Sequence, residues 1–173
     1  SGFVINQLSG GGCEHMGNFP TFPVKGKLKM SPDNILNYRI NISEEKGHAG
    51  YYEAKVQEDI HAKLTVTERT GMASYEYPAD QQYGTVIIGG GISATPIDQA
   101  AIVITAPNKC EGYAEGGNFC GLRTPYKVYF VAEFDTDALE SGTWKRDELK
   151  PNTTFAEGEY SGVYFTFDVN KKK

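Results

Sequence analysis

A short segment near the start of the chain, residues 6–15, combines a glycine run with polar side chains. Glycine has no Cβ, so the run after Ser9 lets backbone approach a ligand closely. Short polar side chains of fixed geometry bind the hydroxyls of ligands such as sugars. The candidate binding residues are Asn6, Gln7, Ser9, Gly11, Cys13, Glu14 and His15. From the residues alone, a tight structural turn between two strands is the favoured interpretation.

The acidic residues of the chain do not form a recognisable catalytic pair. General acid–base catalysis by carboxyl groups needs two of them facing the same reacting bond. Neighbouring acids such as Glu44 and Glu45, or Glu157 and Glu159, are better interpreted as solvated turns. Having 22 Asp and Glu residues is not evidence of a pair. No catalytic residue is therefore predicted in this sequence.

Metal ligands are equally hard to find. Calcium takes about six to eight oxygen ligands, and the sequence contains no loop rich in Asp. The three histidines, His15, His48 and His61, lack the spacing of a metal-binding motif. We therefore predict no metal site within these residues.

The elements that must position the candidate segment are predicted to be β-strands. Apolar residues alternate with polar ones in residues 36–42, 62–66, 128–134 and 163–167, and this period favours strands with one buried face. Continuous apolar runs at 86–88 and 102–104 indicate more central strands. Turn signals occur at 47–50, 89–91 and 140–142. Short strands with frequent turns predict an all-β fold, an antiparallel sandwich of two sheets.

Composition limits the class of protein. The chain has 173 residues, of which 39% are hydrophobic and 23% charged, so we expect one globular domain spanning residues 1–173. The net charge of −5 argues against nucleic acid as a partner. No apolar run approaches the ~20 residues of a membrane-spanning helix, so no membrane partner is expected.

The three cysteines leave their pairing open. Cys110 and Cys120 flank a glycine-rich stretch at 115–117, and a turn there would bring the two together. A Cys110–Cys120 disulfide and two unbonded thiols are both compatible with the sequence. Since the count is odd, at least one cysteine lacks an internal partner.

Five segments, in order along the chain, resemble glycoside hydrolase family 92. Residues 2–23 read GFVINQLSGGGCEHMGNFPTFP, similar to the family's G-F-S-H-T-H-L-S-G-x-G-C, which is followed by G-[DN] and an apolar-proline stretch. Residues 44–52 resemble its E-E…G-Y-Y segment, and 62–67 its A-x-L-T-x-T strand. Residues 75–78 correspond to its aromatic-x-aromatic-Pro, and 127–134 to its V-Y-F-x-A-x-F strand.

The resemblance implies a fold and an activity. Family members join an N-terminal sandwich of the galactose mutarotase type to a C-terminal helical domain, and they remove terminal α-linked mannose with inversion, using calcium. The acid, the base and most calcium ligands are expected on the helical domain. This sequence would then be a sandwich truncated at both ends, inactive alone and without calcium of its own. Beside this resemblance, residues 6–15 are favoured as an active-site loop on the leaving-group side.

One departure leaves the substrate open. Where the family shows Ser-His-Thr-His, this chain has Val4, Ile5, Asn6 and Gln7. Cleavage of α-1,2-linked mannose is the default expectation, as in degradation of N-glycans; cleavage of other mannosides or of mannose-1-phospho-6-mannose caps is the alternative. From another functional class, a non-catalytic carbohydrate-binding or scaffolding sandwich also fits.

Partners and location follow from the same resemblance. The expected partners are an α-mannoside glycan and the protein's own C-terminal helical domain. The isolated chain is expected to self-associate through the face that the helical domain would cover. The resemblance implies a secreted, periplasmic or cell-surface location in a bacterium.

Overall fold

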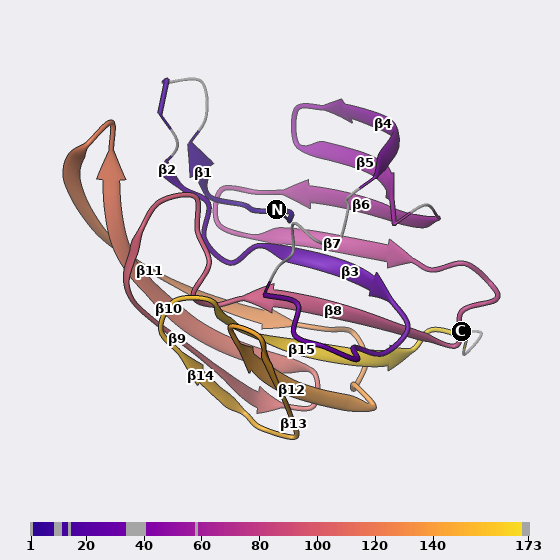
Figure 1. The fold of residues 1–173 in the computed structure, drawn as a ribbon. Helices are drawn as coiled ribbons and strands as arrows, with labels where there is room; N and C mark the ends of the chain where they lie inside the picture. Colours follow the sequence, from indigo (N-terminus) through magenta and orange to yellow (C-terminus); the bar gives the residue numbers. More distant parts are fainter. Residues whose placement is uncertain (1, 9–11, 14, 34–40, 58, 171–173) are drawn as a thin grey trace.

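The computed structural model describes residues 2–8, 12–13, 15–33, 41–57 and 59–170, and these residues contain strands and no helix (Figure 1). Three sheets and one two-stranded ribbon account for the strands, and every pairing is antiparallel. The predicted all-β antiparallel sandwich is confirmed, but in the described residues it is built from three main sheets and not from the two that were expected. In the part of the chain that the structure describes, no helix is long and apolar enough to cross a membrane.

The central sheet has the order β13-β12-β15-β8-β3. Its strands are β13 (Glu148–Pro151), β12 (Glu140–Lys145), β15 (Ser161–Asp168), β8 (Tyr83–Gly89) and β3 (Thr21–Lys25). Its interior strands β15 and β8 are buried on both faces along nearly their whole length. This sheet therefore has two cores, one on each side.

The charged sheet packs on one face of the central sheet. It has the order β4-β5-β6-β7, with β4 (Ile42–His48), β5 (Tyr51–Val56), β6 (Ile60–Val66) and β7 (Gly71–Glu76). Trp144, Tyr164 and Phe22 of the central sheet meet Ile60 and Val56 in the core between them. The opposite face carries a ladder of ion pairs that includes Lys46–Glu53, Lys55–Glu44 and Lys63–Glu76.

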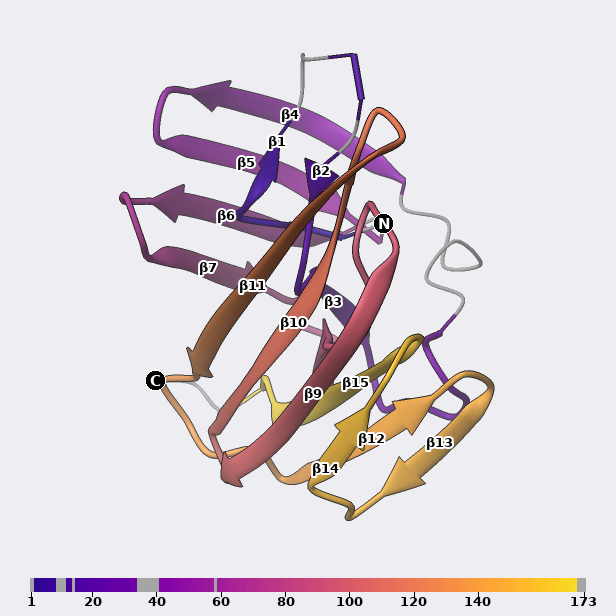
Figure 2. The ribbon, with the colours of Figure 1, turned by 90° about the vertical axis from the view of Figure 1, so that its left-hand side faces the viewer.

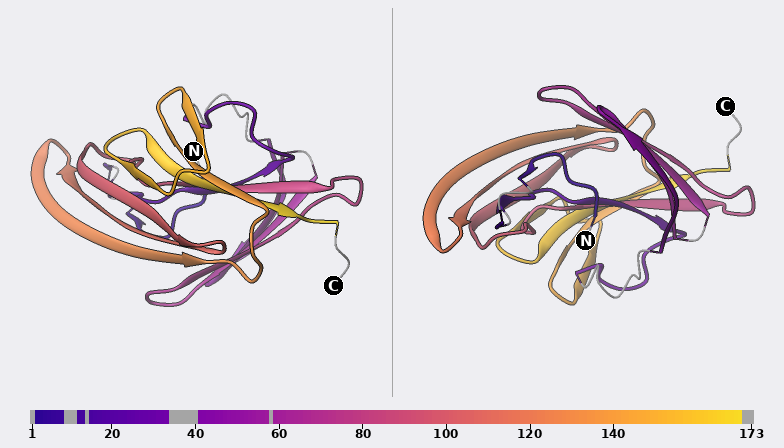
Figure 3. Two further views of the ribbon diagram at one scale, coloured as in Figure 1. Left: turned by 90° about the horizontal axis from the view of Figure 1, so that it is seen from below. Right: turned by 90° about the horizontal axis from the view of Figure 1, so that it is seen from above.

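The curved sheet packs on the other face of the central sheet, with the order β11-β10-β9-β14. Its strands are β11 (Leu122–Glu133), β10 (Lys109–Phe119), β9 (Ile97–Ala106) and β14 (Phe155–Glu157). Val163 and Phe165 of β15 meet Ile102 and Ile104 of β9 in the second core. Figure 3 shows how strongly β10 and β11 curve, and Figure 1 shows β3, β8 and β15 between the two outer sheets.

The strand predictions are mostly confirmed. Residues 128–134 alternate between half-buried and exposed side chains, as a strand with one covered face requires. Residues 163–167 also form a strand, but both of its faces are buried because it lies inside the central sheet. The apolar run at 86–88 lies in β8, a central strand as predicted. Most of the predicted strand at 36–42 lies outside the described residues.

Two turn predictions are wrong. Residues 140–142 start β12; a Cβ at Gly142 would lie 2.5 Å from the Lys150 carbonyl oxygen and 2.8 Å from the Tyr164 ring, so this glycine serves close packing. Residues 115–117 lie within β10, and the chain turns later, at Cys120 and Gly121. In both places glycine marks a close approach of neighbouring strands.

Candidate functional site

The two ends of the candidate segment, residues 6–15, are paired with each other in a two-stranded ribbon. Strand β1 (Gln7–Leu8) pairs with β2 (His15–Met16), with Gln7 opposite Met16. Of the predicted site residues, Asn6, Gln7, Cys13 and His15 are described, and Ser9, Gly11 and Glu14 lie outside the described residues. Figure 2 shows this ribbon at one end of the molecule, beside the far end of β10 and β11.

Phe3 fixes the chain just before the segment. Its backbone exchanges two hydrogen bonds with Thr21 at the start of β3, of 2.8 and 2.9 Å. Its ring contacts Phe22, Tyr52 and Tyr75, so it packs against residues of both the central and the charged sheets. The aromatic residue of the opening motif is therefore an anchor in the core.

Asn6 binds to a buried asparagine that follows β2. The side-chain nitrogen of Asn6 donates to Asn18 Oδ1 at 3.1 Å, and the Asn18 backbone N–H donates to Asn6 Oδ1 at 2.9 Å. The hydroxyl of Tyr126 on β11 also donates to Asn18 Oδ1, at 3.0 Å. Asn18 is only 2% exposed. The polar side chain of Asn6 thus fastens the segment to the body of the domain through Asn18.

Gln7 and His15 are placed differently. Gln7 is exposed. The His15 ring stands edge-on to Phe119 and Tyr126, with ring centroids 5.7 and 5.4 Å apart. His15 Nδ1 and Asn18 Nδ2 are both buried and have no hydrogen-bond partner in the described structure. An unpaired buried polar atom costs about 1–3 kcal/mol, so these two atoms are positions where a water or ligand group would stabilise the segment.

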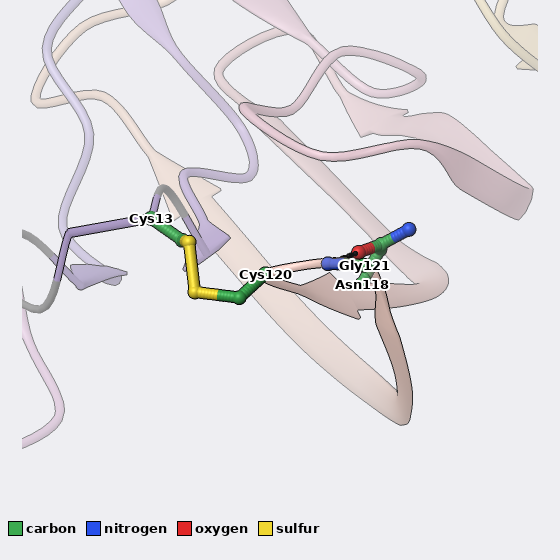
Figure 4. The surroundings of a disulfide bond; sticks show 4 residues. All are labelled: Cys13, Asn118, Cys120 and Gly121. Carbon is green, nitrogen blue, oxygen red and sulfur yellow. Dashed lines mark hydrogen bonds between the residues drawn. A yellow bond between two sulfur atoms is a disulfide. The ribbon is translucent and has the colours of Figure 1, made fainter.

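The disulfide joins Cys13 to Cys120 (Figure 4), with the two Cα atoms 5.4 Å apart and a sequence separation of 107. The Cys110–Cys120 pairing that the sequence left open is therefore wrong. Cys110 is a buried free thiol opposite Ala132, on the face of β10 that packs in the second core. Burial raises the pKa of Cys110 to about 12, so its reactive thiolate form is suppressed.

Sequence reasoning missed three residues of this site: Asn18, Cys120 and Tyr126. Gly17 and Asn18 match the G-[DN] of the opening motif, so the motif itself could have pointed to Asn18. Tyr126 and Cys120 lie more than a hundred residues from their partners. No local pattern reports such a contact.

The described residues do not fit the calcium site that the resemblance implies for the complete enzyme. They contain no group of three or more His, Cys, Asp or Glu side chains arranged to hold a metal ion. Some carboxylates of the described residues, such as Glu53 and Glu76, are paired with Lys46 and Lys63. No chemical step is assigned to a metal on this domain.

The whole chain, residues 1–173, matches a family model described as the glycosyl hydrolase family 92 N-terminal domain. No curated protein sequence matches it. Among solved structures it is similar to the family GH92 α-mannosidase BT3965 from Bacteroides thetaiotaomicron, with 22% identity and a TM-score of 0.80, over 96% of this chain and 24% of that one. It is also similar to the family GH92 inverting mannosidase BT2199 from Bacteroides thetaiotaomicron VPI-5482, with 24% identity and a TM-score of 0.73, over 91% and 20% of the two chains.

A third similar structure is the GH92 family glycosyl hydrolase ccman5, with 21% identity and a TM-score of 0.77, over 96% of this chain and 23% of that one. The chain therefore spans about a fifth to a quarter of the length of these solved relatives. At these identities the structural likeness establishes the fold, and the family model establishes the membership. The chain belongs to glycosyl hydrolase family 92, of which it is an N-terminal domain.

Proposed function

We propose that this domain is the non-catalytic part of an inverting exo-α-mannosidase, and that its segment 6–15 contacts the leaving-group sugar. The family membership supports the reaction class, since two of the similar structures are named as mannosidases. In this proposal a separate helical domain supplies the acid, the base and most of the calcium ligands. The domain described here, residues 1–173, covers one side of that active site.

The observation that carries this proposal is the placement of Gln7. Its side chain is exposed, while the chain around it is fixed by Phe3, Asn6 and the β1–β2 pairing. A neutral amide held on a fixed backbone can donate to and accept from sugar hydroxyls without reorganising. In this proposal the catalytic groups belong to the other domain and bind the mannose that is released. A side chain of this domain, such as Gln7, is therefore better placed to bind the second sugar, the leaving group.

The linkage that the enzyme prefers depends on this same segment. Cleavage of α-1,2-linked mannose, as in the degradation of N-glycans, is the default. Val4, Ile5, Asn6 and Gln7 replace the family's Ser-His-Thr-His, so the contacts to the second sugar differ in kind. Cleavage of other mannosides, including mannose-1-phospho-6-mannose caps, is the alternative within the family.

The disulfide supports a location outside the reducing cytoplasm. Disulfides persist in the periplasm, at the cell surface and in secreted proteins, and Cys13–Cys120 joins segments that are distant in sequence. We place the enzyme in one of these compartments of a bacterium.

A second candidate function is a carbohydrate-binding or scaffolding sandwich without catalysis. The outer face of the curved sheet favours it. That face has a groove of about 350 Å³, lined by Tyr113, Tyr129, Val131 and Phe155. Aromatic side chains on a sheet face can bind a sugar ring or another protein surface. In the leading proposal this face contacts other parts of the same enzyme.

The two candidates are separated by assaying the complete parent protein beside the 1–173 chain. The parent is expected to release mannose from α-1,2-mannobiose, and the 1–173 chain is expected to show no hydrolysis above background, with or without calcium. Hydrolysis by the 1–173 chain would show that it contains catalytic groups. Inactivity of the parent on every α-mannoside, with retained glycan binding, would favour the second candidate.

A further inference from the structure

The far end of β10 and β11 forms an arm that reaches the candidate segment. The two strands pair in regular register from Lys109 to Gly116, and the register then shifts between Gly116 and Asn118. Gly117 has φ of +132°, and a Cβ there would overlap the carbonyl oxygen of Thr124. A β-bulge bends a strand and increases its twist. The bulge therefore redirects the tip of the arm, and Figure 2 shows that tip beside β1 and β2.

The tip is a two-residue turn built from Cys120 and Gly121. Phe119 pairs with Leu122 on either side of it. Both turn residues have positive φ, +51° and +84°, which is the geometry of a type I′ turn. Asn118 closes the turn, because its side-chain oxygen accepts a 2.8 Å hydrogen bond from the Gly121 N–H (Figure 4). Asparagine or glycine is usual where Cys120 stands, and its disulfide to Cys13 gives a reason for cysteine there.

The arm is itself braced against the rest of the curved sheet. The guanidinium of Arg123 donates two hydrogen bonds to the carboxylate of Asp98 on β9, of 3.0 and 2.5 Å. A bidentate pair of this kind fixes direction as well as distance. The start of β11, next to the turn at Cys120 and Gly121, is thus joined to β9.

Three kinds of contact run from this arm to the candidate segment and its flanks. The disulfide holds Cys13 at the tip. The His15 ring lies edge-on to Phe119 and Tyr126. The Tyr126 hydroxyl binds Asn18, which in turn binds Asn6. The entry of the segment at Asn6 and its exit at Cys13 and His15 are therefore all fastened to one hairpin.

We propose that the β10–β11 arm positions the described residues of the segment, Asn6, Gln7, Cys13 and His15, for substrate. This positioning depends on the oxidised Cys13–Cys120 disulfide. The inference rests on the proposed function of the segment. Cys120 and Tyr126 are positioning residues, because they act through Cys13 and Asn18. Reduction of the disulfide removes the only covalent link described between the arm and Cys13. The Asn6–Asn18 hydrogen bonds, the β1–β2 pairing and the contacts of Tyr126 and His15 remain.

The redox step is an ordinary thiol–disulfide exchange. A dithiol donates two electrons and two protons to the Cys13–Cys120 bond and becomes a cyclic disulfide itself, leaving two cysteine thiols. Cys110 offers a matched control, since it is a buried free thiol on β10, the strand that carries the bulge, and takes no part in the disulfide.

The test uses the complete parent protein, oxidised and after treatment with a dithiol, with the variants Cys13→Ser and Cys110→Ala. Hydrogen–deuterium exchange is followed in peptides covering residues 2–8 and 15–26, and KM and kcat are measured on α-1,2-mannobiose. If reduction leaves the segment correctly placed about a fifth of the time, KM rises about fivefold. Since the catalytic groups lie on the other domain, kcat should change by less than about twofold.

Cys13→Ser is expected to reproduce the reduced state and to be insensitive to dithiol, while Cys110→Ala responds to dithiol as the parent does. Unchanged exchange and unchanged KM on reduction would overturn the inference. Faster hydrogen–deuterium exchange on reduction, with unchanged KM and kcat, would confirm that the disulfide holds the segment. It would contradict the proposed role of the segment in binding substrate. If the parent hydrolyses no mannoside, the proposed function fails, and the exchange measurement alone decides whether the disulfide holds the segment.

Discussion

The hydroxyl of Tyr126 donates a 3.0 Å hydrogen bond to the side-chain oxygen of Asn18, a buried residue that also binds Asn6. This bond links β11, an edge strand of the curved sheet, to the candidate segment through Asn18. Tyr126→Phe removes it and leaves the ring in place. We expect a loss of about 0.5–1.5 kcal/mol in the free energy of unfolding, measured by denaturant titration of the domain.

Tyr113→Phe is the matched control, because it removes a hydroxyl from the outer face of the same hairpin, beside Tyr129. The free energy of unfolding of the control should lie within about 0.5 kcal/mol of that of the unmodified chain, as is usual for surface substitutions. Equal losses in the two variants would mean that the bond to Asn18 contributes nothing specific.

The first core should not tolerate a side chain at Gly162. A Cβ there would overlap the ring of the fully buried Trp144 and the carbonyl oxygen of Ile88. Gly162→Ala is therefore expected to destabilise the domain by about 1–3 kcal/mol through overpacking. At Gly47, by contrast, the nearest atoms would be 3.5 Å from a Cβ, so Gly47→Ala should be close to neutral. Similar thermal unfolding of both variants would show that the Trp144 region can rearrange.

The charged sheet should give the domain a pH-dependent stability near the pKa of Glu53. The Tyr51 hydroxyl donates to Glu53 Oε2 at 2.6 Å and, with a smaller contribution from Lys46, holds the pKa of Glu53 below its usual 4.5. A carboxyl with a depressed pKa stabilises the fold above the unfolded value, and this stabilisation is lost as the pH falls through the folded pKa.

Tyr51→Phe removes that donor, so its unfolding temperature should lie below that of the unmodified chain at pH 7. The difference should shrink as the pH falls below 4.5, because the stabilisation is lost as the pH falls through the depressed pKa of folded Glu53. Thermal unfolding at a series of pH values measures it. A difference that stays constant over the whole series would show that the Tyr51 hydroxyl acts independently of the Glu53 charge.

The outer face of the curved sheet should make the 1–173 chain self-associate. Tyr129, Val131 and Phe155 are 69%, 61% and 55% exposed and lie around one groove. An exposed apolar face of this kind favours association. Val131→Lys combined with Phe155→Ser should lower the sedimentation coefficient at high concentration, whereas Met72→Ser, on the charged sheet and 70% exposed, should not. A monomeric 1–173 chain at all concentrations would contradict this expectation.

Local patterns in the sequence predicted the strands well, because period-2 alternation directly reflects one buried face, as at residues 128–134 of β11. They failed at glycines. Gly142 and Gly117 look like turn residues, yet each lies in a strand where a neighbouring backbone leaves no room for a Cβ. Glycine is favoured both in a turn and where two strands approach each other closely. Only the packing of the neighbouring strands in the folded structure distinguishes the two cases.

The candidate site was predicted only in part, for a related reason. Gln7, Cys13 and His15 are close in sequence, and the β1–β2 ribbon keeps them together. Cys120 and Tyr126, the partners of Cys13 and His15, come from the distant β10–β11 hairpin, and Asn18 bonds to Asn6 and Tyr126. Buried polar contacts between distant segments leave no periodic signal, and for the same reason the disulfide pairing could not be read from cysteine spacing.

The central claim is that segment 6–15 contacts the second sugar, and Gln7→Ala in the complete parent protein tests it most directly. Losing one neutral hydrogen bond costs about 0.5–1.5 kcal/mol, which is a several-fold loss of kcat/KM on α-1,2-mannobiose. An activated aryl α-mannoside has no second sugar, so its hydrolysis should be nearly unchanged. Gln99→Ala, at an exposed position of β9, is the control and should affect neither substrate. A selective loss on the disaccharide is the predicted result; equal losses on both substrates would contradict the account and make the segment purely structural.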